Sequence, residues 1–353
     1  MHVLARASSV RSVVRVTGNF TSESPLHPAA KEALLAAFDQ GWADPKKISQ
    51  SSARAAILKN QSLENLGAHL GLRPDAIQVI GEPALGHFLA IAGLLSPTQN
   101  FAYSSIDKGK VRAIACAHPG PVQELTVDAT GQIVQTDDLT DGCVVSLQLA
   151  NGETGVIQNY RPHQKIKVSV DATASGPRLP LPEHWATALF DAQSWAGPAG
   201  LAILAINDSS YTYPLPRIAP INSPGSYSLP LLIAAAIALE NFTPEDPEIR
   251  RYLIDSFSGI AGVAIVAAQS LAVPHKVSLS IPGIAGEQLV RALAEDGIDV
   301  DSGSACSAAD LQPSHVLASM GYPTTGHVRL TLHSGTTKAD IDNLKKALTK
   351  ALS

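Results

Sequence analysis

The stretch CVVSLQLANGETGVIQNYRPHQKIKVSVDA, residues 143–172, decides the fold of this chain. It holds two short apolar runs, 143–150 and 166–172, which a polar segment separates. Valine-rich runs of this length, bounded by Gly, Asp or Asn, are typical of buried strands. A further strand-like run lies at 124–128, and helix-like segments flank the whole stretch. This alternation predicts an α/β domain with a mostly parallel sheet and helices on both faces.

The spacing of apolar residues predicts helices over 28–38 and 53–72, before this sheet, and over 229–239 after it. A polar segment with two prolines follows at 240–248 and marks a change in composition. Beyond that segment, helices and strands alternate in an α+β order. The expected domains are an N-terminal extension (1–20), a large domain (21–243) and a small C-terminal α+β domain (244–353).

Composition excludes several classes of protein. The 353 residues are 45% apolar and 16% charged, which is too apolar for a disordered chain. The net charge of −5 argues against nucleic acid or an anionic membrane as a partner. Three scattered cysteines and eleven histidines without HxH or HxxxH spacing predict neither a disulfide framework nor a metal site. Without a membrane-length apolar run or a secretory signal, the expected location is the cytoplasm.

Five motifs share one order along the chain. They are NGETGVIQ (151–158), VDATAS (170–175), GPAGLAIL (197–204), the segment 286–323 around SGSACS, and HVRLTLHSGTTKADID (327–342). Together they resemble the cysteine desulfurases of the class V aminotransferase family. The resemblance implies the fold type I architecture of pyridoxal phosphate (PLP) enzymes, with a seven-stranded sheet in the large domain. It also implies a homodimer with each site at the interface, for which 229–239 and 213–226 are the expected contacts.

Four residues match the positions that carry the family's chemistry. The resemblance places Asn151 near the oxygen of the cofactor ring and Asp171 beside the pyridine nitrogen. It gives Cys306 the role of sulfur nucleophile and Arg329 that of a clamp for the substrate carboxylate, which suits a planar guanidinium. Each residue also has a structural alternative: Asn151 as a turn former, Asp171 as a cap, Cys306 as an inert thiol and Arg329 as an ion-pair partner.

The family's cofactor lysine is replaced in this chain. Counted back from Gly197, its position holds Ser194, and a hydroxyl group cannot form an imine. The nearest lysines along the chain are Lys165 and Lys167, on the strand that leads to Asp171. The sequence therefore predicts that covalent binding of PLP is lost.

The family's phosphate-binding turn is altered as well. It reads Glu82-Pro83-Ala84 here, which places a carboxylate and a proline where backbone N–H groups should face a dianion. Asp191 and Gln193 replace the family's phosphate-binding Ser and His, and the ring-stacking His, counted without gaps, falls on Asp107. We therefore expect that no cofactor is bound, and that Asn151, Asp171 and Ser194 line an altered pocket.

Three functions are open at this point. The first is a pseudoenzyme that serves as a binding or assembly partner with its Cys306 loop retained, as a homodimer or with an active paralogue. The second is an active desulfurase or lyase that handles sulfur or a small amino acid through Cys306 and Arg329, with a sulfur carrier as a further partner. The third is a structural homodimer with a vestigial pocket.

Overall fold

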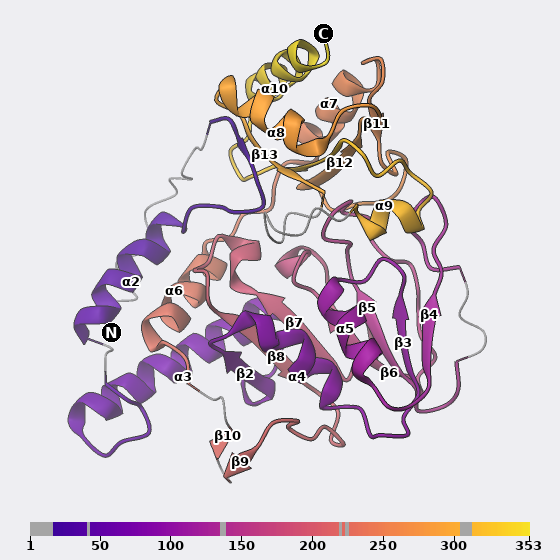
Figure 1. Cartoon of the computed structure of the whole chain (residues 1–353). Helices are drawn as coiled ribbons and strands as arrows, with labels where there is room; N and C mark the ends of the chain where they lie inside the picture. Colours follow the sequence, from indigo (N-terminus) through magenta and orange to yellow (C-terminus); the bar gives the residue numbers. More distant parts are fainter. Residues whose placement is uncertain (1–16, 41–42, 135–138, 219–220, 223–225, 304–312) are drawn as a thin grey trace.

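The apolar runs of the first 206 residues form one seven-stranded sheet (Figure 1). The computed structural model describes residues 17–40, 43–134, 139–218, 221–222, 226–303 and 313–353. In sheet order the strands are β2 (Ile77–Ile80), β8 (Ala202–Ile206), β7 (Thr187–Asp191), β6 (Lys167–Asp171), β5 (Val144–Gln148), β3 (Phe101–Ser104) and β4 (Val122–Leu125). All neighbours are parallel except β8, which is antiparallel to β2 and β7. The predicted mostly parallel α/β sheet is confirmed.

Helices cover both faces of this sheet because successive strand residues point to opposite sides. Val145 and Leu147 pack in the cluster under α2 and α6, whereas Val144 packs in the cluster under α4 and α5. The helices of this layer are α2 (Pro28–Gln40), α3 (Gln50–Leu70), α4 (Gly86–Ala92), α5 (Gly109–Ala117) and α6 (Leu229–Glu240). Short 3₁₀ helices are η2 (Pro74–Ala76), η3 (Pro83–Leu85), η4 (Gly176–Arg178) and η5 (Ala192–Trp195).

Helix α6 does not form the exposed dimer contact that the sequence suggested. Ten of its residues are buried, and it packs against α2 and α3 (Figure 1). Ala-rich and Leu-rich on all sides, it is a core helix of the single chain. The side chains of the other suggested contact, 213–226, lie partly outside the described residues; within it, β9 (Arg217–Ile218) and β10 (Ile221–Asn222) pair antiparallel.

A five-stranded sheet forms the second half of the molecule. Its order is β1 (Asn19–Phe20), β13 (Asp299–Ser302), β14 (His327–Thr331), β12 (Lys276–Ser280) and β11 (Ala264–Ile265). The helices here are α7 (Pro247–Phe257), α8 (Gly286–Glu295), α9 (His315–Ser319) and α10 (Lys338–Ala351). Phe20 lies in this core although it comes from the N-terminal part of the chain. No helix in the described part of the chain is long and apolar enough to cross a membrane.

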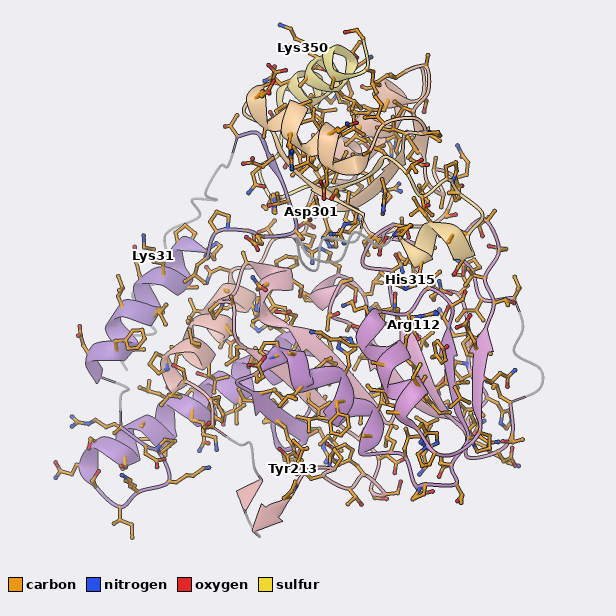
Figure 2. All side chains as sticks on the ribbon, in the orientation of Figure 1. Lys31, Arg112, Tyr213, Asp301, His315 and Lys350 are labelled. Carbon is orange, nitrogen blue, oxygen red and sulfur yellow. The ribbon has the colours of Figure 1, made fainter. Side chains whose placement is uncertain are left out.

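The two halves meet at the carboxyl ends of β5, β6 and β7. Helix α9 contacts the large sheet there, since His315 Nε2 lies 2.8 Å from the backbone carbonyl oxygen of Asp107. Asp301 lies on the small-domain side of the same junction (Figure 2). In open α/β sheets, ligands bind outside the carboxyl ends of the strands. The junction is therefore the place to look for a site.

Candidate functional site

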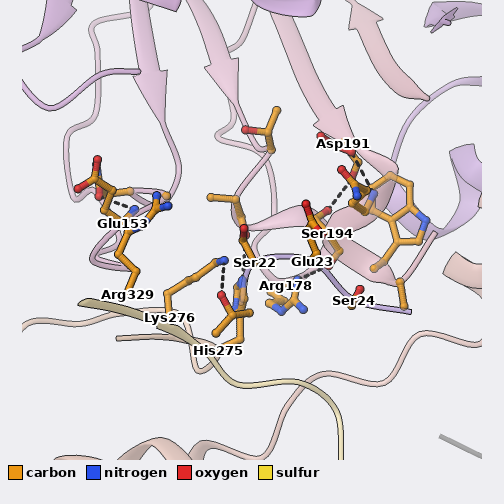
Figure 3. A pocket seen from close by; sticks show the side chains of 18 of the residues that line it. Ser22, Glu23, Ser24, Glu153, Arg178, Asp191, Ser194, His275, Lys276 and Arg329 are labelled. Carbon is orange, nitrogen blue, oxygen red and sulfur yellow. Dashed lines mark hydrogen bonds between the residues drawn. The ribbon is translucent and has the colours of Figure 1, made fainter. Parts of the chain in front are cut away.

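A cavity of about 1090 Å³ lies between the two halves. Residues from the large sheet line one side, among them Asn151, Asp191 and Ser194. Lys276 and Arg329, from strands of the small domain, enter from the other side (Figure 3). The cavity is large enough for a cofactor and a small substrate together.

Asp171 ends β6 and is buried, and three residues that contact it, His87, Lys108 and Thr173, line this cavity. Its Oδ2 lies 2.9 Å from His87 Nε2 and 3.5 Å from Lys108 Nζ, and its Oδ1 accepts from the backbone N–H of Thr173 at 2.8 Å. Burial by itself raises the pKa of Asp171, but the charges of Lys108 and His87 bring that pKa well below its ordinary value. The carboxylate is therefore ionised and held in one orientation.

Lys108 occupies the cavity wall where counting along the sequence placed Asp107. Asp107 is wholly buried and accepts a hydrogen bond from the backbone N–H of Ser104 at 3.0 Å. Burial raises the pKa of Asp107 to about 7. Lys108 instead lines the cavity and donates to the hydroxyl of Thr173. The count without gaps that matches Asp107 to the family's ring-stacking His stays a prediction; Asp107 itself does not line the cavity, whereas its neighbour Lys108 does.

The residues expected near a phosphate cap their own short helices. A Glu82 carboxylate oxygen accepts the backbone N–H of Ala84 at 3.2 Å, at the start of η3. An Asp191 carboxylate oxygen likewise accepts the backbone N–H of Gln193 at 3.0 Å, at the start of η5. These two N–H groups are thus already paired with carboxylates, as expected at a helix N-terminus.

Ser194 lies in η5 and lines the cavity. Its hydroxyl donates to the backbone carbonyl of Asp191 at 2.7 Å, and its own carbonyl accepts from Arg178 Nη1 at 2.7 Å. Gly176 lies close by: a Cβ there would stand 2.4 Å from Ser194 Oγ. The family comparison that assigns the lysine position to Ser194 remains a prediction, and the structure puts that position on the cavity wall.

Asn151 also lines the cavity, but its side chain is fully used inside the turn. Its Nδ2 donates to the backbone carbonyl of Ile106 and to Gln148 Oε1, each at 3.1 Å. Its Oδ1 accepts the backbone N–H groups of Glu153 and Thr154 at 2.9 and 3.0 Å. These contacts favour the turn-forming role among the two alternatives that the sequence left open.

Arg329, in β14, combines both of its alternatives. Its Nη2 lies 3.9 Å from Asp301 Oδ2, a loose ion pair. Its Nε is buried and has no hydrogen-bond partner within the described part of the chain. Arg329 also lines the cavity, so an unsatisfied donor is present where an anion would bind. Cys306 lies outside the described residues, although Gly303 and Pro313, on either side of its segment, line the cavity.

Three functional groups escaped the sequence analysis. His87 follows a glycine in the altered turn and supports Asp171 from behind. Arg178 makes two hydrogen bonds to Glu245, at 2.7 and 2.5 Å, and its guanidinium stacks 4.7 Å from the Phe242 ring centre. Lys276 is half-buried in the cavity wall. Each of the three is brought to the site by contacts with residues distant in sequence, which no local pattern shows.

The two lysines that the sequence analysis considered nearest are far from the cavity. Lys165 pairs with Asp141 at 2.5 Å, and Lys167 Nζ donates to Ser210 Oγ at 2.6 Å. Lys167 begins β6 whereas Asp171 ends it, so the strand separates them along its whole length. Within the described residues, no group of three or more His, Cys, Asp or Glu side chains is placed to hold a metal ion.

Comparisons with known proteins agree on one family as the one that this chain is similar to. The model of the aminotransferase class-V family matches residues 220–344. The cysteine desulfurase IscS of Dictyoglomus turgidum is 25% identical over 364 residues, covering 92% of this chain and 91% of that protein. The cysteine desulfurase IscS 1 of Archaeoglobus fulgidus is 28% identical over 253 residues, covering 64% of this chain and 66% of that protein.

Solved structures show the same fold. A NifS-like protein superposes with a TM-score of 0.81 at 20% identity, covering 96% of this chain and 99% of that chain. The NifS-like protein from Rickettsia africae gives a TM-score of 0.80 at 17% identity, with coverages of 96% and 99%. Because cysteine desulfurases depend on PLP, a cofactor is expected here, and the prediction that none is bound is wrong. Over most of its length the chain is thus similar to cysteine desulfurases, and its residues 220–344 match the model of the class V aminotransferase family.

Proposed function

We propose that this chain binds PLP in the cavity between its two halves and acts there on a small amino acid. The observation that carries the proposal is Asp171, a buried and ionised carboxylate at the carboxyl end of a central strand. A carboxylate kept charged in a buried site needs cations beside it; Lys108 and His87 contact Asp171 here, and a bound cation can join them. A protonated pyridine nitrogen is such a cation, and the bound cofactor supplies an electron sink for a carbanion at the substrate's α-carbon.

The charges on the cavity wall fit an anionic cofactor. Among the described residues, six Lys and Arg side chains line it against four Asp and Glu: Lys108, Lys110, Arg112, Arg178, Lys276 and Arg329, against Glu23, Glu153, Asp191 and Glu245. Since Glu82 and Asp191 already occupy backbone N–H groups, the cofactor phosphate would be held chiefly by side chains. Lys108 and Lys110, at the start of α5, are the cations near Asp191 and suit this role.

Arg329 is the residue that we propose binds the substrate carboxylate. Its unpartnered Nε and its loose contact with Asp301 leave guanidinium donors available for a second carboxylate. Glu153 lies close to Arg329 and accepts a hydrogen bond from Ser314 Oγ at 2.6 Å. Burial raises the pKa of Glu153, and the Ser314 hydrogen bond and the charge of Arg329 lower it by less. A small amino acid would thus be oriented with its carboxylate toward β14.

Cys306 is the group we propose for sulfur. Both described residues beside its segment, Gly303 and Pro313, line the cavity. A desulfurase reaction, as the relatives' names state for those proteins, is therefore the proposed activity, with the thiol of Cys306 as the sulfur acceptor.

Equilibrium dialysis with PLP tests the cofactor part of this function. We expect saturable binding, and about a tenfold to hundredfold loss of affinity for Asp171→Asn, because a hydrogen bond to a charged group contributes about 1.5–3 kcal/mol. Asp208→Asn is the matched control, because Asp208 lies beside Lys167 at the opposite end of β6. Absence of saturable binding to the unmodified chain contradicts the proposal.

A role as binding or assembly partner of an active relative is the second candidate. The carboxylates of Glu82 and Asp191 favour it, because they weaken the hold on phosphate and hence turnover. Measured sulfide release from cysteine with PLP present distinguishes the two: release that is lost in Cys306→Ala supports the enzyme, and binding without release supports the partner. A homodimer, a sulfur-carrier partner and a cytoplasmic location remain predictions, the first of which light scattering measures.

A further inference from the structure

Lys276 is the first residue of β12, and its half-buried side chain lies in the cavity wall. Its Nζ donates to Thr331 Oγ1 at 2.8 Å, across the antiparallel pair of β12 and β14 (Figure 3). Among the described residues, no carboxylate lies within 4.0 Å of this nitrogen. A lysine that is half-buried in a cavity wall, with no paired charge among these residues, is available to a ligand in the cavity.

The backbone around Lys276 is fixed against the large domain from two sides. Gly155, at a φ of +75°, faces it so closely that a Cβ there would stand 2.8 Å from Lys276 Cβ. The preceding residue, His275, lies with its Nε2 3.1 Å from the backbone carbonyl oxygen of Ala174, in the segment that follows Asp171. Lys276 is thus held between the turn of Asn151 and the segment of Asp171.

The charges around Lys276 favour the neutral amine. Burial first, and then the nearby cations Arg329, Arg178 and Lys108, lower its pKa to about 8 against the opposing charge of Asp301. A neutral amine has the lone pair that attacks a carbonyl carbon, and desolvation is a known way of activating such lysines.

We infer that Lys276 is the amine that this chain offers to the aldehyde of a ligand bound beside Asp171, in place of the lysine that Ser194 replaces. This inference rests on the proposed binding of PLP. The Nζ atom forms a bond to the aldehyde carbon, the carbon–oxygen bond breaks, and the oxygen leaves as water with the two protons of the amine. The product is a carbon–nitrogen double bond, and no atom is oxidised or reduced.

Lys108, the other lysine beside Asp171, is less suited to this step. Its Nζ is 3.5 Å from Asp171 Oδ2 and donates to Thr173, so it is bound as an ammonium ion without a free lone pair. Lys165 and Lys167 lie at the other end of β6. A bond at Lys276 would also join a strand of the small domain to a ligand held by a strand of the large one.

Reductive trapping with peptide mapping tests the inference. The full chain is incubated with PLP, reduced with sodium borohydride, digested and mapped by mass spectrometry. We expect the reduced adduct at Lys276, and at least a tenfold loss of adduct in Lys276→Arg and in Lys276→Met. Lys167→Arg, far from the cavity, is the control and should keep the adduct.

The outcomes separate this inference from the proposed function. Saturable binding in dialysis without a reducible adduct contradicts the role of Lys276 and leaves the binding intact. An adduct mainly at Lys108, or spread over exposed lysines, also overturns it. Absence of binding contradicts both. Because the map of the unmodified chain gives the answer by itself, a variant that fails to fold does not decide the test.

Discussion

His87 Nε2 lies 2.9 Å from Asp171 Oδ2, and both side chains are buried. The pair joins α4 to the carboxyl end of β6 and fixes which way the carboxylate faces. Lys108 contacts the same oxygen from the cavity side. Asp171 is thus held between His87, inside the protein, and Lys108, which lines the cavity, much as second-layer partners fix groups in other buried sites.

Replacing His87 should destabilise the chain. In His87→Leu, Asp171 loses one of its hydrogen bonds, and we expect the free energy of unfolding to fall by about 1.5–3 kcal/mol, the range for a bond to a charged group. Urea denaturation at neutral pH measures this. His184→Leu, at an exposed position, should change the same quantity by less than about 0.5 kcal/mol. Equal effects of the two changes would contradict the supporting role.

The reactivity of Lys276 should depend on pH with a midpoint near its pKa of about 8. The neutral amine attacks, so the initial rate of trapping by PLP and borohydride should rise as the pH is raised from 6 to 9. An ordinary lysine, with a pKa of about 10.4, would still be rising steeply at the upper end of that range. A rate midpoint at that higher pH would contradict a desolvated amine.

Lys276 should also make the free energy of unfolding of the chain depend on pH. Because burial lowers its pKa from 10.5 to about 8, the folded chain binds fewer protons than the unfolded one between these values, and stability falls as the pH is lowered through that window. Lys276→Met removes this cost and should raise the free energy of unfolding at pH 7 by up to about 3 kcal/mol. Denaturation at pH 7 and pH 10 measures it, and a gain that is as large at pH 10 contradicts the explanation.

Arg178 and Glu245 form a buried ion pair at the junction, with side chains 6% and 8% exposed. Arg178 also donates to the backbone carbonyls of Ser175 and Ser194. Removing one partner leaves a buried charge, so Glu245→Gln should cost about 3–5 kcal/mol of stability. Arg251→Gln, which breaks an exposed pair with Glu248, should cost less than about 1 kcal/mol. Thermal and urea denaturation compare the two.

A lysine at position 194 should share the reduced PLP adduct with Lys276. Ser194 already lines the cavity, so in Ser194→Lys we expect the reduced PLP adduct at position 194 as well as at Lys276. The added side chain must pass Gly176, which lies so close to Ser194 that a Cβ on Gly176 would stand 2.4 Å from Ser194 Oγ. Peptide mapping reads both positions at once. An adduct that stays wholly at Lys276 would mean that position 194 does not face the bound aldehyde.

The sequence predicts the sheet because its signal is local. The runs at 143–150 and 166–172 are short, valine-rich and bounded by turn formers, and they become β5 and β6. Asp171 was found for the same reason, since it ends one of these runs. Helix α6 was predicted as a helix but expected at a dimer contact, because nothing in its own residues shows that α2 and α3 cover it.

The cavity was harder to predict because its groups come from distant segments. Lys276 lies 105 positions after Asp171 along the chain, and only the pairing of β12 with β14 and the approach of Gly155 bring it to the wall. Arg178 and Glu245 meet for a similar reason. The altered phosphate turn suggested an empty pocket, whereas the cations on the wall, which the sequence could not gather, fit an anionic cofactor.

A crystal structure of the full chain soaked with PLP tests the central claim most directly. We predict ligand density in the cavity with the pyridine nitrogen facing Asp171 and the aldehyde carbon joined to Lys276 Nζ. Ligand in the cavity but separate from Lys276 would contradict the inferred bond alone. A cavity without ligand at concentrations that saturate a cysteine desulfurase would contradict the proposed function itself.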